Sequence, residues 1–175
     1  MEYFTTTSKP SRRAVDCVIV GIFDRGKLGV AARDIDSASS GEIRRLIKSG
    51  DISSELGQCA MLTRLEGVKA PRVVVVGLGK SSAFGARQFR KAVAAAATMI
   101  GKTKAQQALN GLTLETVAKT SRYYLARHSA EAFGAMLYRF DKMKSGRQPA
   151  ASSLKKIGFA IAGREDAAET LRGAE

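Results

Sequence analysis

Short runs of apolar, β-branched residues alternate along this chain with segments in which apolar residues recur every three or four positions. The runs predict strands, and the four consecutive valines within 72–76 predict a strand that is covered on both faces. We expect strands over residues 2–7, at a sheet edge, and over 16–23, 58–64, 72–76, 111–114 and 156–162.

Helical periodicity follows several of these runs. One helix is expected over about 86–100, with Phe89 and Val93 on its apolar stripe and Gly101 at its end. A longer helix is expected over 116–143, and another begins within 164–171. The apolar stripe of the longer helix consists of Ala126, Ala130, Phe133, Leu137 and Phe140.

A shorter helix is expected after residues 39–42, Ser-Ser-Gly-Glu, which have the form of a capping box. In such a box the Ser39 hydroxyl and the Glu42 carboxylate each accept a hydrogen bond from a backbone N–H of the first turn. Gly50 is the expected C-terminal stop. Strands that alternate with helices in this way predict an α/β domain in which a parallel or mixed sheet lies between helix layers.

The net charge of the chain says more about its possible partners than the rest of its composition does. The 175 residues fit one domain, and 29 Lys and Arg against 16 Asp and Glu give a formal net charge of +13. Such an excess attracts polyanions, although a basic surface that is only solvated explains it equally well. The N-terminus lacks the apolar stretch of a signal peptide, and no apolar run approaches the ~20 residues of a membrane span. We therefore expect a cytoplasmic protein without a membrane partner.

The segment that follows the valine run is a candidate anion-binding turn, made of Gly77, Gly79, Lys80 and Ser81. A P-loop would need a glycine at Val74, and a dinucleotide fingerprint would need one at Ser82, so neither motif is present. Two interpretations remain. The turn leads into a helix whose first N–H groups bind an anion, or it is a sharp exit from a buried strand.

Basic residues form candidate nucleic-acid contacts. Arg87, Arg90 and Lys91 lie at the start of the predicted helix 86–100, and Lys142, Lys144 and Arg147 lie at the end of the predicted helix 116–143. Contacts from these side chains to phosphates would give salt-sensitive, sequence-tolerant binding. The alternative for the group near Lys142 is that the cations complement the dipole at a helix C-terminus.

Residue types that carry catalysis are sparse. His128 is the single histidine, and we expect it on a solvated helix surface. Asp34 and Asp36 are the closest acidic pair and are expected to be surface residues. Cys17 and Cys59 form no Cys-x-x-Cys pair, and Cys17 is expected to be a small buried apolar residue. These residues identify no catalytic or metal-binding site.

Taken as an ordered set, several segments resemble the N-terminal domain of the leucyl aminopeptidase (cytosol aminopeptidase) family. The resemblance covers nearly the whole chain and is carried by DCVIVGIFD, SGEIRRLIKSGDISSELGQ, CAMLTRLEGVKAPRVVVVGLGK, ARQFRKAV and LYRFDKMKS. It implies a macro-domain-like mixed β-sheet sandwiched between helices. It also implies a domain over residues 1–163 and, over 164–175, the start of a linker helix toward a catalytic domain.

The family places its chemistry in the C-terminal domain, where a Lys, three Asp and a Glu bind two divalent metals (Zn, Mn or Mg). No segment of this chain matches that region, so the resemblance implies a non-catalytic domain without a cofactor of its own, and a chain that is part of a longer enzyme. The expected partners are the catalytic domain and, through it, a homohexamer. DNA is a second candidate partner because some bacterial members bind it, and ADP-ribose a third because of the macro-like fold.

Overall fold

The structure is a computed structural model that describes residues 1–142 and 152–175, with side chains for 1–138 and 152–175. Six strands form one sheet in the order β1-β6-β5-β2-β4-β3, in which β3 is antiparallel to β4 and the other neighbours are parallel. The strands are β1 (Glu2–Thr6), β2 (Cys17–Phe23), β3 (Cys59–Thr63), β4 (Arg72–Gly79), β5 (Gln107–Asn110) and β6 (Lys156–Ala160).

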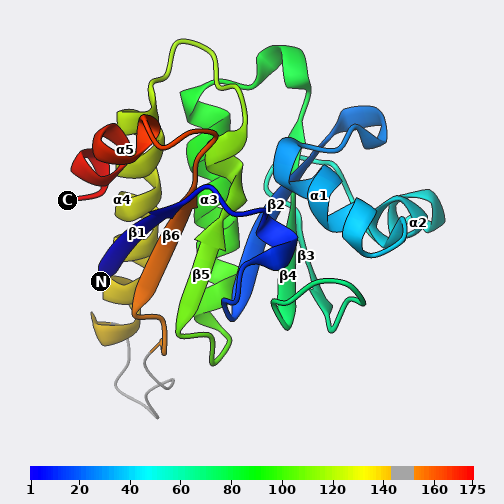
Figure 1. The fold of residues 1–175 in the computed structure, drawn as a ribbon, viewed down its shortest axis with the longest axis horizontal. Coiled ribbons are helices and arrows are strands. Elements are labelled where there is room, and N and C mark those ends of the chain that lie inside the picture. Colours follow the sequence, from blue (N-terminus) through cyan, green and yellow to red (C-terminus); the bar gives the residue numbers. More distant parts are fainter. Residues whose placement is uncertain (143–151) are drawn as a thin grey trace.

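Helices cover both faces of this sheet (Figure 1). The helices of the described residues are α1 (Val30–Ala38), α2 (Glu42–Ser49), α3 (Ala86–Gly101), α4 (Arg122–Lys142) and α5 (Asp166–Ala174). Side chains of β2 alternate between two cores: Cys17 and Ile19 pack with α3 and α4, whereas Val18 and Val20 pack with α1 and α2. The predicted α/β sandwich is confirmed, and it has the three layers that two buried sheet faces require.

The centre of the sheet contains a topological switch point. The chain leaves β2 through α1 and α2 toward β3 and β4, and it leaves the neighbouring strand β5 through α4 toward β6 on the other side. Adjacent parallel strands whose connections depart in opposite directions leave a crevice at their carboxyl ends, where α/β proteins commonly bind ligands. The loops after β2 and β5 therefore border the position at which a site is most readily built.

Most predicted strands are confirmed to within a few residues, but the segment after β5 was predicted wrongly. Residues 107–110 form the strand, and Gly111–Leu114 form a 3₁₀ turn instead. The long helix begins at Arg122 rather than at 116, because Ala118 N–H donates to Phe84 carbonyl (3.2 Å) and Lys119 has a φ of 55°. A bridge to another loop and left-handed backbone are both incompatible with an α-helix.

Helix α1 is absent from the predictions, and its residues overturn two of them. Asp36 is a surface residue in the prediction, whereas its side chain is fully buried. Its carboxylate accepts hydrogen bonds from the backbone N–H of Arg44 (3.0 Å) and from the guanidinium of the same residue (2.6 Å). The predicted capping box is wrong, because the Ser39 hydroxyl donates to the Ile35 carbonyl (2.8 Å) in α1. Asp36 therefore caps the N-terminus of α2, the role that was predicted for Ser39. Gly50 ends α2 as predicted.

We expect Asp36→Ala to lower the free energy of unfolding by about 2 kcal/mol, because the first turn of α2 loses its acceptor and Arg44 its buried partner. Ser39→Ala removes only bonds to carbonyls that helix α1 already satisfies, and should cost less than about 1 kcal/mol. Urea denaturation of both variants measures the difference. Equal losses would contradict the assignment of the cap to Asp36.

Across the described residues, no helix combines the length and the apolarity that crossing a lipid bilayer requires.

Candidate functional site

A carboxylate occupies the switch-point edge of the sheet. Glu115 directly follows the 3₁₀ turn after β5, and the residue is only 4% exposed. Its Oε1 accepts a hydrogen bond of 2.7 Å from the backbone N–H of Val30, the first residue of α1. A helix N-terminus presents free N–H groups and a positive dipole end, so an anionic oxygen is well placed there. In this chain that oxygen comes from a residue 85 positions away.

The close approach depends on a glycine. Gly29 N–H donates to the Gly21 carbonyl at 2.9 Å, which holds the loop after β2 against its own strand. A Cβ atom at Gly29 would lie 2.3 Å from Glu115 Oε1 and 2.7 Å from the Gly21 carbonyl oxygen. Both separations are shorter than real contacts, so a residue with a side chain does not fit between the helix start and the carboxylate.

Burial governs the protonation of this carboxyl group. Desolvation raises the pKa of Glu115 to about 7, although the Val30 N–H and the charges of Arg33 and Lys27 oppose the rise. A pKa near neutral is a common property of functional carboxyl groups, but a buried structural carboxyl group has it too. No signal within the local sequence distinguishes Glu115 from any other loop glutamate, and sequence reasoning missed it.

The predicted anion-binding turn lies at the end of β4, which runs three residues beyond the prediction and includes Gly77 and Gly79. Gly77 N–H donates to the Gln58 carbonyl (2.8 Å), and Gly79 N–H donates to the Ser54 carbonyl (3.0 Å). Both glycine N–H groups thus already have backbone acceptors. Anion binding by Lys80 and Ser81, which follow the strand, stays a prediction.

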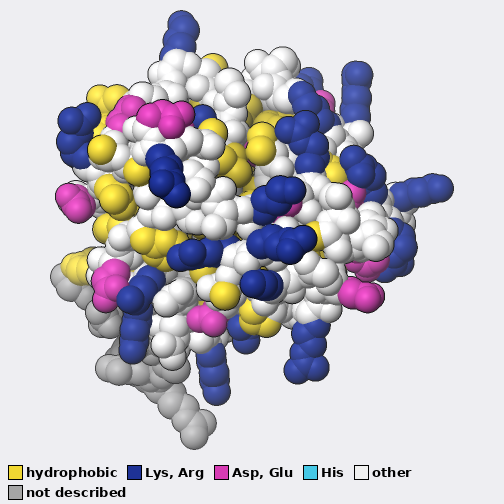
Figure 2. Space-filling model, in the orientation of Figure 1, with side chains coloured by type: hydrophobic (Ala, Val, Ile, Leu, Met, Phe, Trp, Pro, Cys, Tyr) yellow, Lys and Arg dark blue, Asp and Glu magenta, His cyan; other side chains and the backbone are white. Residues whose placement is uncertain are grey.

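The predicted nucleic-acid contacts fall into separate places. Arg87, Arg90 and Lys91 lie together on the first two turns of α3. Lys142 is the last residue of α4, and Lys144 and Arg147 lie outside the described residues. Because α3 and α4 both follow parallel strands and run back in the same direction, the start of α3 and the end of α4 lie at opposite edges of the helix layer (Figure 1). On the other face, Lys and Arg side chains are spread over the whole view (Figure 2).

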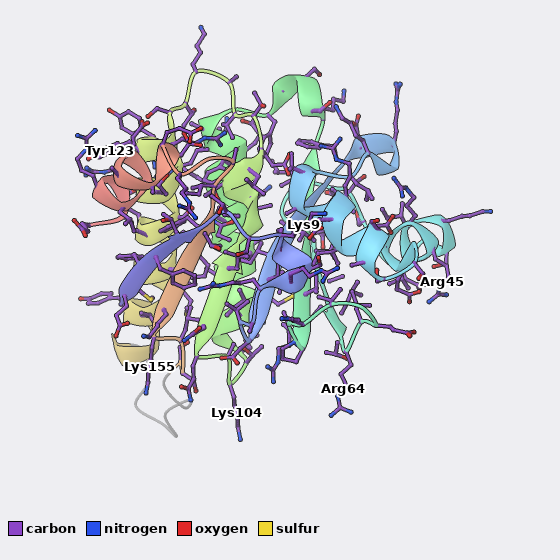
Figure 3. All side chains as sticks on the ribbon, viewed as in Figure 1. Lys9, Arg45, Arg64, Lys104, Tyr123 and Lys155 are labelled. Atoms are coloured by element: carbon purple, nitrogen blue, oxygen red, sulfur yellow. The ribbon has the colours of Figure 1, made fainter. Side chains whose placement is uncertain are left out.

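Other basic side chains line the edge of the sheet where the parallel strands begin. Arg64 follows β3, Lys104 precedes β5 and Lys155 precedes β6, and all three extend into solvent (Figure 3). The positive charge is therefore distributed around the domain rather than collected in one stripe. A distributed charge agrees with the solvated basic surface that the sequence left open.

A groove of about 600 Å³ separates α3 from α4. It contains the three predicted cations of α3, and its other wall contains His128, which was expected to be a solvated surface residue. The His128 side chain is only 18% exposed, and its Nδ1 lies 3.4 Å from Glu131 Oε2. The lining consists of Ala86, Arg87, Arg90, Lys91, Ala94, His128, Glu131, Ala132 and Ala135.

Metal and thiol chemistry find no support among the described residues. Among the side chains that the structure describes, those of residues 1–138 and 152–175, no group of three or more His, Cys, Asp or Glu is placed to hold a metal ion. Burial raises the pKa of the Cys17 thiol to about 12 and that of the Cys59 thiol to about 11. Such thiols stay protonated at neutral pH and are poor nucleophiles. Cys17 is fully buried, as predicted for a small apolar residue.

Comparison with known proteins connects this fold to a family. The model of the cytosol aminopeptidase family, N-terminal domain, matches residues 19–147. The chain belongs to the cytosol aminopeptidase family. Probable cytosol aminopeptidases from Halorhodospira halophila and Burkholderia cenocepacia are 34% and 37% identical to it, over 95% and 83% of the chain. These matches cover 33% and 29% of the relatives, so the chain spans about a third of the length of the curated relatives it matches.

Solved structures show the same fold. A mutant of tomato leucine aminopeptidase superposes with a TM-score of 0.74 at 19% identity, over 99% of this chain and 35% of that one. The bottromycin maturation enzyme BotP, also solved in complex with Mn, gives 0.59 at 28% identity, over 92% of this chain and 30% of that one. A Trypanosoma brucei macrodomain superposes with a TM-score of 0.75 at 11% identity, over 99% of this chain and 67% of that one. The macro-domain-like fold predicted from the resemblance is therefore confirmed.

Proposed function

We propose that this domain is the non-catalytic N-terminal module of a metal-dependent aminopeptidase that removes N-terminal residues from peptides. The observation that carries the proposal is the match to the family's N-terminal domain, in relatives about three times as long. The catalytic partner is then the remaining two thirds of such a polypeptide. The domain contributes a rigid sheet with helices on both faces, and its helix surfaces are available for assembly.

The proposal assigns the divalent metals to the catalytic part. The described residues of this chain do not fit a two-metal site, since none of their carboxylate, imidazole or thiol groups converge in sets of three or more. We therefore derive no catalytic step from them. Zinc, manganese and magnesium are the candidate metals of the whole enzyme, and the Mn complex of the similar enzyme BotP supports manganese.

The boundary of the module is proposed at residue 163, with 164–175 leading toward the catalytic part. Helix α5 lies within that second segment and packs on the domain: a Cβ atom at Gly173 would meet the Tyr123 carbonyl oxygen at 2.1 Å. A cytoplasmic location and a homohexamer of the whole enzyme complete the proposal. The names of the curated relatives, cytosol aminopeptidases, support the location.

The purified chain is expected to show no turnover of a leucine amide substrate with Mn²⁺, because the groups that bind metal and activate water lie outside it. The full-length relative from Halorhodospira halophila, assayed in the same buffer, serves as the positive control. Turnover that stays with the 175-residue chain through two chromatographic steps would refute the proposal that it is non-catalytic.

A DNA-binding accessory role is the second candidate, and the net charge of +13 supports it. The wide distribution of the cations does not favour one duplex-binding surface. An ADP-ribose role has only the likeness of fold behind it. The side chain of Glu115 already accepts the hydrogen bond of the Val30 N–H at the start of α1, so a phosphate in the same position would have to displace it.

A further inference from the structure

The groove between α3 and α4 has one strongly basic wall. Arg87, Arg90 and Lys91 are exposed on α3, and none of them forms an ion pair with a carboxylate among the described residues. The Lys91 stem passes close to Gly57, since a Cβ atom at Gly57 would lie 3.3 Å from Lys91 Cε. All three side chains line the groove. These three side chains therefore present charge toward the groove without a partner inside the described part of the chain.

Their positions oppose the stability of α3. Arg87 lies in the first turn, which has no acidic residue, so it faces the positive end of the helix dipole. Arg87 also repels Arg90 and Lys91, which are three and four residues further on. A local arrangement that costs stability without a compensating contact is characteristic of a binding surface.

The floor and the opposite wall of the groove differ in chemistry from the basic side chains of α3, which form one rim. Alanines of both helices, Ala86, Ala94, Ala132 and Ala135, leave the groove shallow and apolar. Glu131 is the carboxylate of the lining, and it is already engaged with Arg127 (3.2 Å) and His128 (3.4 Å). The groove thus combines a small-residue floor, which admits the ridge of another helix, with a net positive rim.

We propose that this groove docks an acidic amphipathic segment of another protein chain, with its apolar residues on the alanine floor and its carboxylates beside Arg87, Arg90 and Lys91. Charge complementarity selects this partner. A second copy of this chain is disfavoured because its net charge is also +13.

Nucleic acid fits the groove less well than an acidic peptide. A phosphate backbone does not use an apolar floor, and Glu131 on the far wall repels it. The three cations also span only the first two turns of one helix, whereas duplex binding draws on contacts to roughly 6–10 phosphates.

The test uses a labelled peptide of roughly 16 residues, with a leucine and alanine stripe flanked by glutamates at helical spacing. Anisotropy titrations compare the wild-type chain with the triple variant Arg87→Glu, Arg90→Glu, Lys91→Glu. The matched control, Lys48→Glu, Lys69→Glu, Lys104→Glu, makes the same change in net charge at exposed sites outside the groove. Ala132→Phe fills the floor without altering charge. A DNA duplex is titrated in parallel.

We expect the wild type to bind the peptide, the groove triple to lose about tenfold or more in affinity, and the control triple to lose markedly less. Ala132→Phe should weaken binding of the peptide and leave binding of the duplex unchanged. The groove triple should melt about 1–3 °C higher than the wild type, because glutamates suit the start of α3; the lost affinity is then not a loss of folding.

Three results would overturn the proposal. The first is no binding of the peptide by the wild type, and the second is an equal loss in both triple variants. The third is a triple variant of the groove that loses affinity for the duplex but keeps the wild-type affinity for the peptide. Each is independent of whether the whole enzyme is an aminopeptidase.

Discussion

Gly77→Ala is expected to destabilise the domain by about 3 kcal/mol or more, a large effect for the addition of a single methyl group. A Cβ atom at this position would lie 2.0 Å from the Glu55 carbonyl oxygen and 2.7 Å from the Ser54 carbonyl carbon. These are backbone atoms, and the loop that contains them is bonded on both sides of the glycine, through Gly57 N–H to the Gly77 carbonyl (2.9 Å) and Gly77 N–H to the Gln58 carbonyl (2.8 Å). The loop cannot move without loss of these hydrogen bonds.

The same substitution in the middle of α4 provides the control. A Cβ atom at Gly134 meets no atom within 4 Å. Alanine is the better helix former, so Gly134→Ala should raise the free energy of unfolding by about 0.5–1 kcal/mol. Urea denaturation followed by circular dichroism measures both variants. If Gly77→Ala unfolds at the wild-type urea midpoint, then packing does not require the glycine at this position.

Glu115 should make the domain less stable as the pH rises from about 4.5 to about 7. Burial raises the pKa of this carboxyl group from 4.5 to about 7 in the folded state. Between these values the folded chain holds a proton that the unfolded chain has released, so the free energy of unfolding falls with increasing pH and levels off above about 7. The size of this contribution is about 3 kcal/mol.

Comparison with Glu115→Gln isolates this contribution, because carboxylates elsewhere, such as Glu2 and Glu42, have lowered pKa values and act in the opposite direction. The amide oxygen can still accept the Val30 N–H. We expect the variant to be more stable than the wild type at pH 8 and to lose this advantage toward pH 4.5. Denaturation midpoints at five pH values measure the difference, and a difference that does not vary with pH would contradict the assignment.

The local pattern of residues determined the strands and the longer helices of this protein. Helix α3, with Phe89 and Val93 on its stripe, was predicted to within one residue, and the start of β4 was predicted at Arg72, although that strand runs three residues further than expected. Both predictions rest on the pattern of residues that are close together in the chain. The resemblance of ordered segments also predicted the family and the macro-like sheet, which the family match and the structural neighbours confirm.

Tertiary structure decided the contacts that give these elements their roles. Asp36 caps α2 from inside α1, Glu115 reaches Val30 across 85 positions, and Gly77 admits the backbone of residues 54–55. The groove likewise exists because β4 and β5 place α3 beside α4. In each case the partners belong to different elements, from 8 positions apart for Asp36 and Arg44 to 85 for Val30 and Glu115, and burial, which depends on the whole fold, sets the charge and the space around them. Periodicity within one segment contains no information about either.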